Sequence, residues 1–77
     1  MNKARRKSLE KATELLQEAM AIIEEAMDEE QEAFDNLPES IQYSDRGEEM
    51  EENIYELEGA KDEIESQIEV IEDIINR

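Results

Sequence analysis

Two long stretches of this chain place apolar residues at alternating intervals of three and four, and no other feature constrains its fold as strongly. The first stretch runs through Leu9, Ala12, Leu16, Ala19, Ile23, Ala26, Ala33 and Leu37, and the second through Met50, Ile54, Leu57, Ile64, Ile68, Ile71 and Ile75. Side chains with this spacing lie along one face of an α-helix. The sequence therefore predicts two long helices, over about residues 3–35 and 45–76.

The segment between the two stretches, FDNLPESIQYSD, carries the signals of a helix break. Pro38 cannot donate a backbone hydrogen bond, and it disfavours helical geometry in the residue before it. Asn36 suits a helix C-terminus, while Asp45 and Glu48 have capping-box spacing for the start of the second helix. Residues 38–42 have room for one short helical turn.

A loop over residues 36–44 is too short for anything but an antiparallel return of the chain. The fold class predicted for residues 1–77 is therefore all-α, a single domain that forms an antiparallel two-helix hairpin. Its apolar faces are wider than one partner helix needs, because Leu15, Met20, Ile22, Met27, Phe34, Val70 and Ile74 flank the main repeats. We expect two copies to associate into a four-helix bundle. The alternative is that a different protein covers this surface.

The predicted core and dimer contacts come from the main repeats: Leu9, Leu16, Ala19, Ile23, Ala26, Leu57, Ile64, Ile68, Ile71 and Ile75. Alanine at every second repeat position of the first helix would let a partner helix approach closely. Glu30 and Lys61 interrupt the two repeats. They could fix the register of the helices, or they could extend to the edge of the bundle.

Charge divides the chain into a short basic start and a long acidic body. The chain has 24 acidic and 8 basic residues, and its first eleven residues hold five of the basic ones and a single acid. The remainder therefore holds 23 carboxylates and three basic side chains, a net charge of −20. On helices of about 45–50 Å this is about one carboxylate per 2 Å, comparable with the one charge per ~1.7 Å of B-DNA.

The acidic body has two interpretations. It could mimic the charge of a nucleic acid, or it could form a solvated surface that keeps the chain soluble. The basic start of the chain also has two interpretations. It could contact nucleic acid or an anionic membrane, but in a hairpin it lies beside Glu65, Glu69, Glu72 and Asp73, and we expect it to neutralise these acids.

The composition excludes several classes of activity. Cys and His are both absent, which removes disulfides, thiolate chemistry, the usual zinc sites and His-based acid–base catalysis. We therefore predict no enzyme, no catalytic residue, no metal site and no cofactor. No apolar run approaches the ~18 residues of a membrane span, and no signal-peptide core follows the basic start. The expected location is the cytoplasm, without membrane contact or direct nucleic-acid binding.

The opening MNKARR, the loop FDN-x-P-E-S-x-Q from Phe34 to Gln42, and S-x-R-G-E from Ser44 to Glu48 form a recognisable set. In these motifs the chain resembles a family of short, acidic, uncharacterised proteins of Firmicutes bacteria and their phages. The family has no established activity. A phage setting implies that a small inhibitor of a host or defence protein is a reasonable expectation.

The predicted function is that of a non-enzymatic protein-binding module, more specifically an inhibitor that occupies a basic groove on a nucleic-acid-handling or defence protein. The partner-binding residues would be the acidic row Glu51, Glu58, Glu65 and Glu72, with the loop residues Leu37, Ile41, Tyr43 and Arg46. Alternatively, the apolar loop residues only close the end of the hairpin. The alternative function is a structural or assembly module, a homodimeric bundle whose contacts use the apolar face.

Overall fold

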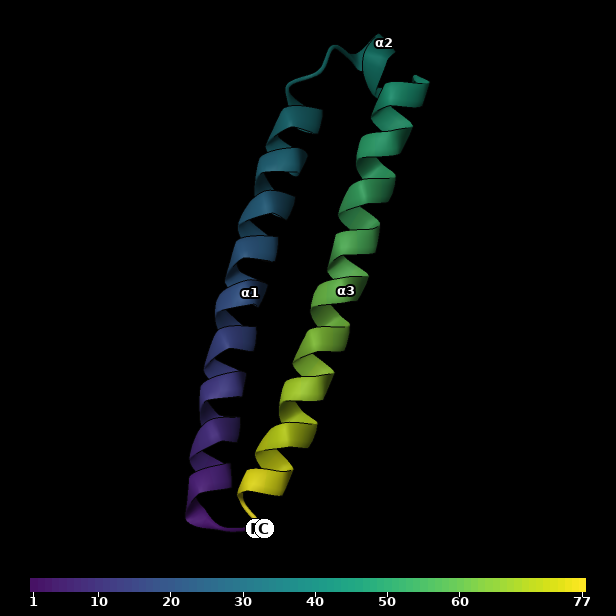
Figure 1. Ribbon diagram of the computed structural model, residues 1–77. Helices are drawn as coiled ribbons and strands as arrows, with labels where there is room; N and C mark the ends of the chain where they lie inside the picture. Colours follow the sequence, from purple (N-terminus) through teal and green to yellow (C-terminus); the bar gives the residue numbers. More distant parts are fainter.

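The computed structural model describes residues 1–77 as two long helices that lie side by side and run in opposite directions (Figure 1). Helix α1 spans Lys3–Asp35, the one-turn helix α2 spans Glu39–Gln42, and helix α3 spans Asp45–Ile75. The Cα atoms extend over 58 × 15 × 12 Å. The predicted all-α hairpin is confirmed, including the short turn within the loop. Both chain ends lie at one end of this rod, the open end, and the loop lies at the other, the closed end.

Local hydrogen bonds explain where α1 begins and ends. The Asn2 side chain accepts a hydrogen bond from the Arg5 backbone N–H at 2.8 Å, which satisfies one of the free donors of the first turn. At the other end, Asn36 caps the helix and its backbone N–H donates to the Glu32 carbonyl oxygen at 3.1 Å. Pro38 follows two residues later, as the sequence predicted, and prevents α1 from continuing.

Helix α3 starts at Asp45, as predicted, but it is capped differently. Ser44 occupies the N-cap position and Asp45 is already the first helical residue, so the predicted capping box of Asp45 and Glu48 does not form. The Ser44 hydroxyl donates instead to the Ile41 carbonyl oxygen and ties the new helix to α2. The carboxylates of Asp45 and Glu48 still lie in the first turn, where the helix dipole favours negative charge.

The closed end brings backbone segments into close contact. Gly47 is buried, and a Cβ atom at this position would lie 2.0 Å from the Gln42 carbonyl oxygen. The Gln42 side chain donates to the Phe34 carbonyl oxygen at 3.1 Å. The end of α1, the short α2 and the first turn of α3 are therefore held together by direct contacts between backbones and one side chain.

Along the rod, the second helix follows the predicted repeat throughout, and the first follows it only in part. The α3 positions Met50, Ile54, Leu57, Lys61, Ile64, Ile68, Ile71 and Ile75 are all buried or half-buried. On α1, Leu9, Leu16, Ile23 and Glu30 are half-buried as predicted, but they are joined by buried Thr13 and half-buried Met20, Met27 and Phe34.

The alanine row of α1 lies beside the helix contact rather than within it. Ala12 and Ala19 are half-buried, whereas Ala26 and Ala33 are exposed, so the prediction that Ala26 packs in the core is wrong for the single hairpin. The physical reason is area, because the Met and Phe side chains remove far more apolar surface from water against α3 than a methyl group does.

This hairpin has almost no interior. Only Thr13, Gly47 and Ile68 are buried, and Ile68 is the single buried apolar side chain, with 5% of its surface exposed. Two helices in one layer can cover each other along one line only, and both flanks of that line meet solvent. The rod therefore presents two broad faces, one on each side of the layer.

Candidate protein-interaction faces

One face of the rod carries the predicted acidic row. A groove near the closed end is lined by Gln31, Phe34, Glu51, Ile54, Tyr55 and Glu58, and a second groove towards the open end is lined by Gln17, Met20, Glu65, Ile68, Glu69 and Glu72. The four predicted glutamates recur every seven residues, about two helical turns, and so stay on one side of α3. We call Glu51, Glu58, Glu65, Glu72 and the two grooves beside them the acidic face.

The carboxylates of this face have no basic partners. All four predicted glutamates are exposed, and the one salt bridge in the molecule lies elsewhere, between Lys11 and Glu14 at 3.6 Å on α1. An exposed pair of this kind contributes little to stability. The negative charge of the acidic face is therefore free to act on another molecule.

The predicted neutralisation by the basic start is not seen as ion pairing. No Lys or Arg of residues 3–11 forms a salt bridge with α3. The Arg6 guanidinium instead donates from Nη2 to the carbonyl oxygen of Arg77 at 2.9 Å, which holds the two chain ends together. Lys3, Arg5 and Lys7 are exposed and form no salt bridge.

The opposite face of the rod combines apolar side chains with four glutamates. Its grooves are lined by Ala26, Glu29, Glu30, Asn53, Glu56 and Leu57, and by Leu16, Ala60, Glu63, Ile64, Ser66 and Gln67. The alanine row of α1 borders these grooves, and beyond it Leu15 and Ile22 are 53% and 68% exposed. We call this surface, centred on Ala12, Ala19 and Ala26, the apolar face.

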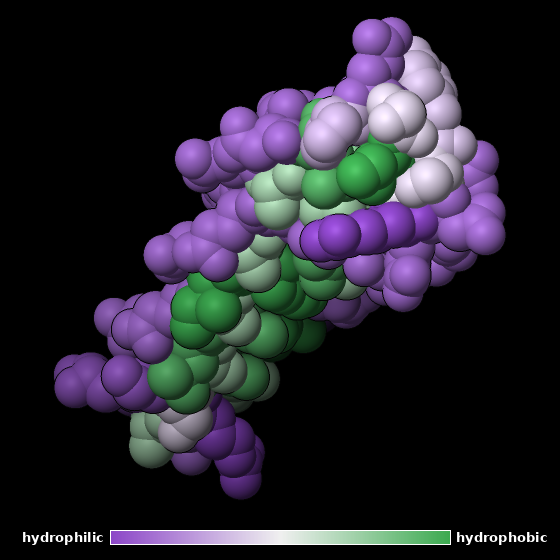
Figure 2. Space-filling model, turned by 90° about the horizontal axis from the view of Figure 1, so that it is seen from above, coloured by the Kyte–Doolittle hydropathy of each residue, from purple (hydrophilic) through white to green (hydrophobic).

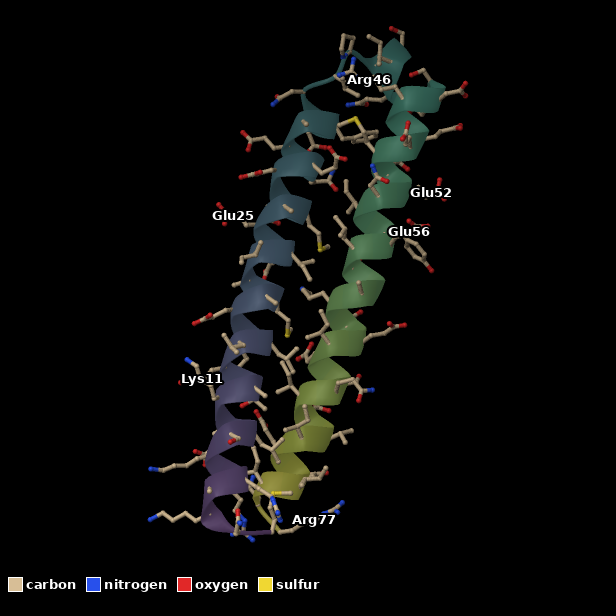
Figure 3. The ribbon with its side chains drawn as sticks, in the orientation of Figure 1. Lys11, Glu25, Arg46, Glu52, Glu56 and Arg77 are labelled. Atoms are coloured by element: carbon tan, nitrogen blue, oxygen red, sulfur yellow. The ribbon has the colours of Figure 1, made fainter.

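Exposed hydrophobic atoms can be seen on the surface of the molecule. Figure 2, seen from above, shows them gathered in a band next to hydrophilic side chains. Figure 3 shows Glu25, Glu52 and Glu56 at the outer edges of the helices, away from the contact between them. An exposed apolar band with charged margins is typical of an interaction surface.

Glu30 is the one acidic side chain that bonds across the hairpin. Its Oε2 accepts a hydrogen bond from Asn53 Nδ2 at 3.3 Å, and Glu30 is half-buried. This contact joins α1 to α3. It therefore favours the interpretation in which Glu30 fixes the register of the helices over the one in which its side chain extends to the edge of the bundle. Lys61 is also half-buried, without a salt bridge.

The structure separates the four predicted loop residues into two kinds. Leu37 and Ile41 are half-buried and help to close the end of the hairpin. Tyr43 is 78% exposed and Arg46 is exposed, so these two remain available at the closed end (Figure 3). Sequence reasoning missed Tyr55, which is equally exposed and lines the groove between Glu51 and Glu58. The sequence feature that could have identified Tyr55 is that it is an aromatic residue outside the apolar repeat.

No group of three or more acidic side chains is close enough to hold a metal ion, and no helix has the length and apolar content of a membrane span. Comparisons with protein-family models, with curated proteins and with solved structures gave no match. The resemblance in the loop motif therefore stays a prediction. The candidate function rests on the acidic face and the apolar face of the rod.

Proposed function

We propose that this chain is a non-enzymatic acidic module that binds a protein through its acidic face. The observation that carries the proposal is the row of four exposed glutamates on one side of α3, none of which is paired with a basic side chain. Successive members are about 10 Å apart at ~1.5 Å per residue. A rod that carries such a row of unpaired charge fits a basic groove that normally holds a nucleic acid.

The acidic face offers more than charge. Phe34, Met20 and Tyr55 line the same grooves as the glutamates, so apolar and aromatic contacts accompany the electrostatic ones. Tyr43 and Arg46 at the closed end would add specificity. Electrostatic complementarity mainly raises the association rate and the selectivity, while buried aromatic side chains supply affinity.

The resemblance to phage-encoded proteins sharpens the choice of partner. A short acidic protein made by a phage gains most by inhibiting a host or defence protein that handles nucleic acid. The proposed mechanism is steric and electrostatic occupation of the groove, without chemical modification of the partner.

Displacement from DNA tests this function. DNA-coated beads are loaded with a bacterial extract at low salt and washed with this chain, and the released proteins are identified by mass spectrometry. We expect the chain to release a DNA-bound protein at low salt, and raised salt to weaken direct binding of the chain to that purified protein. Release of no protein beyond that caused by buffer would contradict the proposal.

A matched pair of variants distinguishes the effect of the acidic row on binding from the effect of the total charge. The first variant changes Glu51, Glu58, Glu65 and Glu72 to Gln, and the second changes Glu18, Glu25, Asp28 and Glu32 of α1 to their amides. Each removes four negative charges from exposed positions. The proposal expects the first variant to lose at least tenfold in displacement and the second to retain most of it. Equal losses would show that net charge alone acts.

A second candidate function rests on the apolar face. The exposure of Leu15 and Ile22 favours an assembly module, in which two hairpins pack into a four-helix bundle. The acidic side chains would then only keep the outer surface of the bundle solvated. Binding through an apolar interface is insensitive to salt, whereas binding through the acidic face weakens steeply as salt is raised.

A further inference from the structure

We infer that the apolar face is covered by a second copy of this chain in an antiparallel two-fold dimer, with α1 antiparallel to the partner's α1 and the two-fold axis passing near Ala19. The inference rests on the self-association proposed above and specifies its geometry. The open end of each hairpin would lie beside the closed end of the other. The acidic faces of both copies would then point outwards.

The size of the face matches a stable dimer. The hairpin presents an outline of 58 by 15 Å, and only three of its 77 residues are buried. Contact over most of this outline would bury about 800 Å² per partner, which is the size of a standard specific interface. It would also enclose Leu15, Ile22 and Ala26, which solvent reaches in the single hairpin.

Charge favours self-pairing through the apolar face. A dimer through the acidic face would bring two rows of Glu51, Glu58, Glu65 and Glu72 together, with no basic side chain between them. On the apolar face, the α3 positions at the same seven-residue spacing are Asn53, Ala60, Gln67 and Ile74, with Glu56 and Glu63 beside them. Covering this surface therefore brings fewer α3 carboxylates together than pairing through the acidic face.

Charge also decides the orientation of the two copies. Residues 3–11 of α1 carry five basic side chains and one acid, whereas residues 24–35 carry seven acids and no basic side chain. Antiparallel pairing of α1 with the partner's α1 places the basic segment of each copy against the acidic segment of the other. Pairing with both loops at one end would instead gather the two basic segments together.

The alanine row sets the position of the axis. Ala12, Ala19 and Ala26 are separated by seven residues each, so Ala19 lies midway between the other two. With the axis near Ala19, Ala12 of one copy faces the partner's Ala26. The small side chains allow the helix axes to approach to about 8 Å, the lower end of the usual range.

Engineered cysteines test this geometry, because the chain has none of its own. Under mild oxidation, Ala19→Cys should form a covalent dimer with itself. Ala12→Cys and Ala26→Cys should each cross-link weakly alone and at least tenfold more efficiently when mixed. The matched control is Ala21→Cys, which is exposed on the other side of α1 and should stay uncross-linked.

Sedimentation of the unmodified chain makes the outcomes distinguishable. A dimer mass with the expected cross-links supports the arrangement. A dimer mass in which Ala19→Cys fails to cross-link, or in which Ala12→Cys couples to itself as well as to Ala26→Cys, overturns it while self-association stands. A monomer at tens of micromolar overturns both, and the displacement assay on the acidic face remains an independent result.

Discussion

The closed end and the shaft of this hairpin are stabilised in different ways. At the closed end a few unique contacts stabilise the structure. Gly47 packs against the Gln42 backbone, and the Gln42 side chain donates a hydrogen bond to the Phe34 carbonyl oxygen. Along the shaft the same apolar contact is repeated many times, yet Ile68 is the only apolar side chain that becomes buried. The closed end determines where the chain reverses, and the shaft depends on the sum of many partial burials.

This difference predicts different responses to substitution. A unique backbone contact has no substitute, so a small steric change there should act locally and strongly. A repeated contact tolerates the loss of any one half-buried member, but the single buried position should be an exception. The following three predictions compare the two regions, beginning with the largest effect.

Ile68→Asp should destabilise the shaft most. The change places a carboxylate at the one buried apolar position and should cost roughly 3 kcal/mol or more. Thermal unfolding followed by circular dichroism measures the loss, and helicity should fall at room temperature. The control is Glu69→Gln, at the neighbouring exposed position, which should change little. Equal losses from the two variants would overturn the assigned helix contact.

Gly47→Ala should destabilise the closed end by about 1–3 kcal/mol, because the added methyl group would overlap the Gln42 backbone. Gly59→Ala is the matched control, since a Cβ there meets nothing within 4 Å. That second change should stabilise α3 by up to about 1 kcal/mol, because Ala favours helix over Gly. Opposite shifts in melting temperature are therefore expected. A stabilising Gly47→Ala would mean that the loop packs differently.

Sodium chloride should stabilise the shaft by a smaller amount. Carboxylates recur at four-residue spacing on both long helices, as in Glu25 with Glu29 and Glu65 with Glu69. Each such pair costs ~0.2–0.5 kcal/mol, and salt screens this repulsion. Raising the salt concentration to 1 M should increase the melting temperature by about 4–8 °C if it recovers about 1 kcal/mol. A lower melting temperature in salt would indicate attractive ion pairs along the shaft.

Local signals in the sequence were sufficient for the outline of the fold. Apolar periodicity, Asn36 and Pro38 predict two helices whose observed bounds agree to within one residue. These signals act within a few residues of the chain, so they need no knowledge of tertiary contacts. The four glutamates of the acidic row could be placed on one side of α3 for the same reason.

The contacts between the helices were harder to predict. The alanine row and the row of Met20, Met27 and Phe34 are both compatible with a helical repeat, and only packing against α3 selects the second. Burial of Gly47 depends on the path of the loop, which the motif S-x-R-G-E does not specify. The free basic segment also escaped prediction, because nearby opposite charges do not have to form ion pairs when both are well solvated.

The meeting of the two chain ends gives the rod a single end at which either terminus can be attached. Arg6 and Arg77 are joined by a hydrogen bond at the open end, while Tyr43 and Arg46 lie at the closed end of a rod that is 58 Å long. A surface or a fused domain attached through either terminus would therefore hold the loop at the same distance and in the same direction. Tags or immobilisation chemistry placed at either terminus would leave the closed end free to bind a partner.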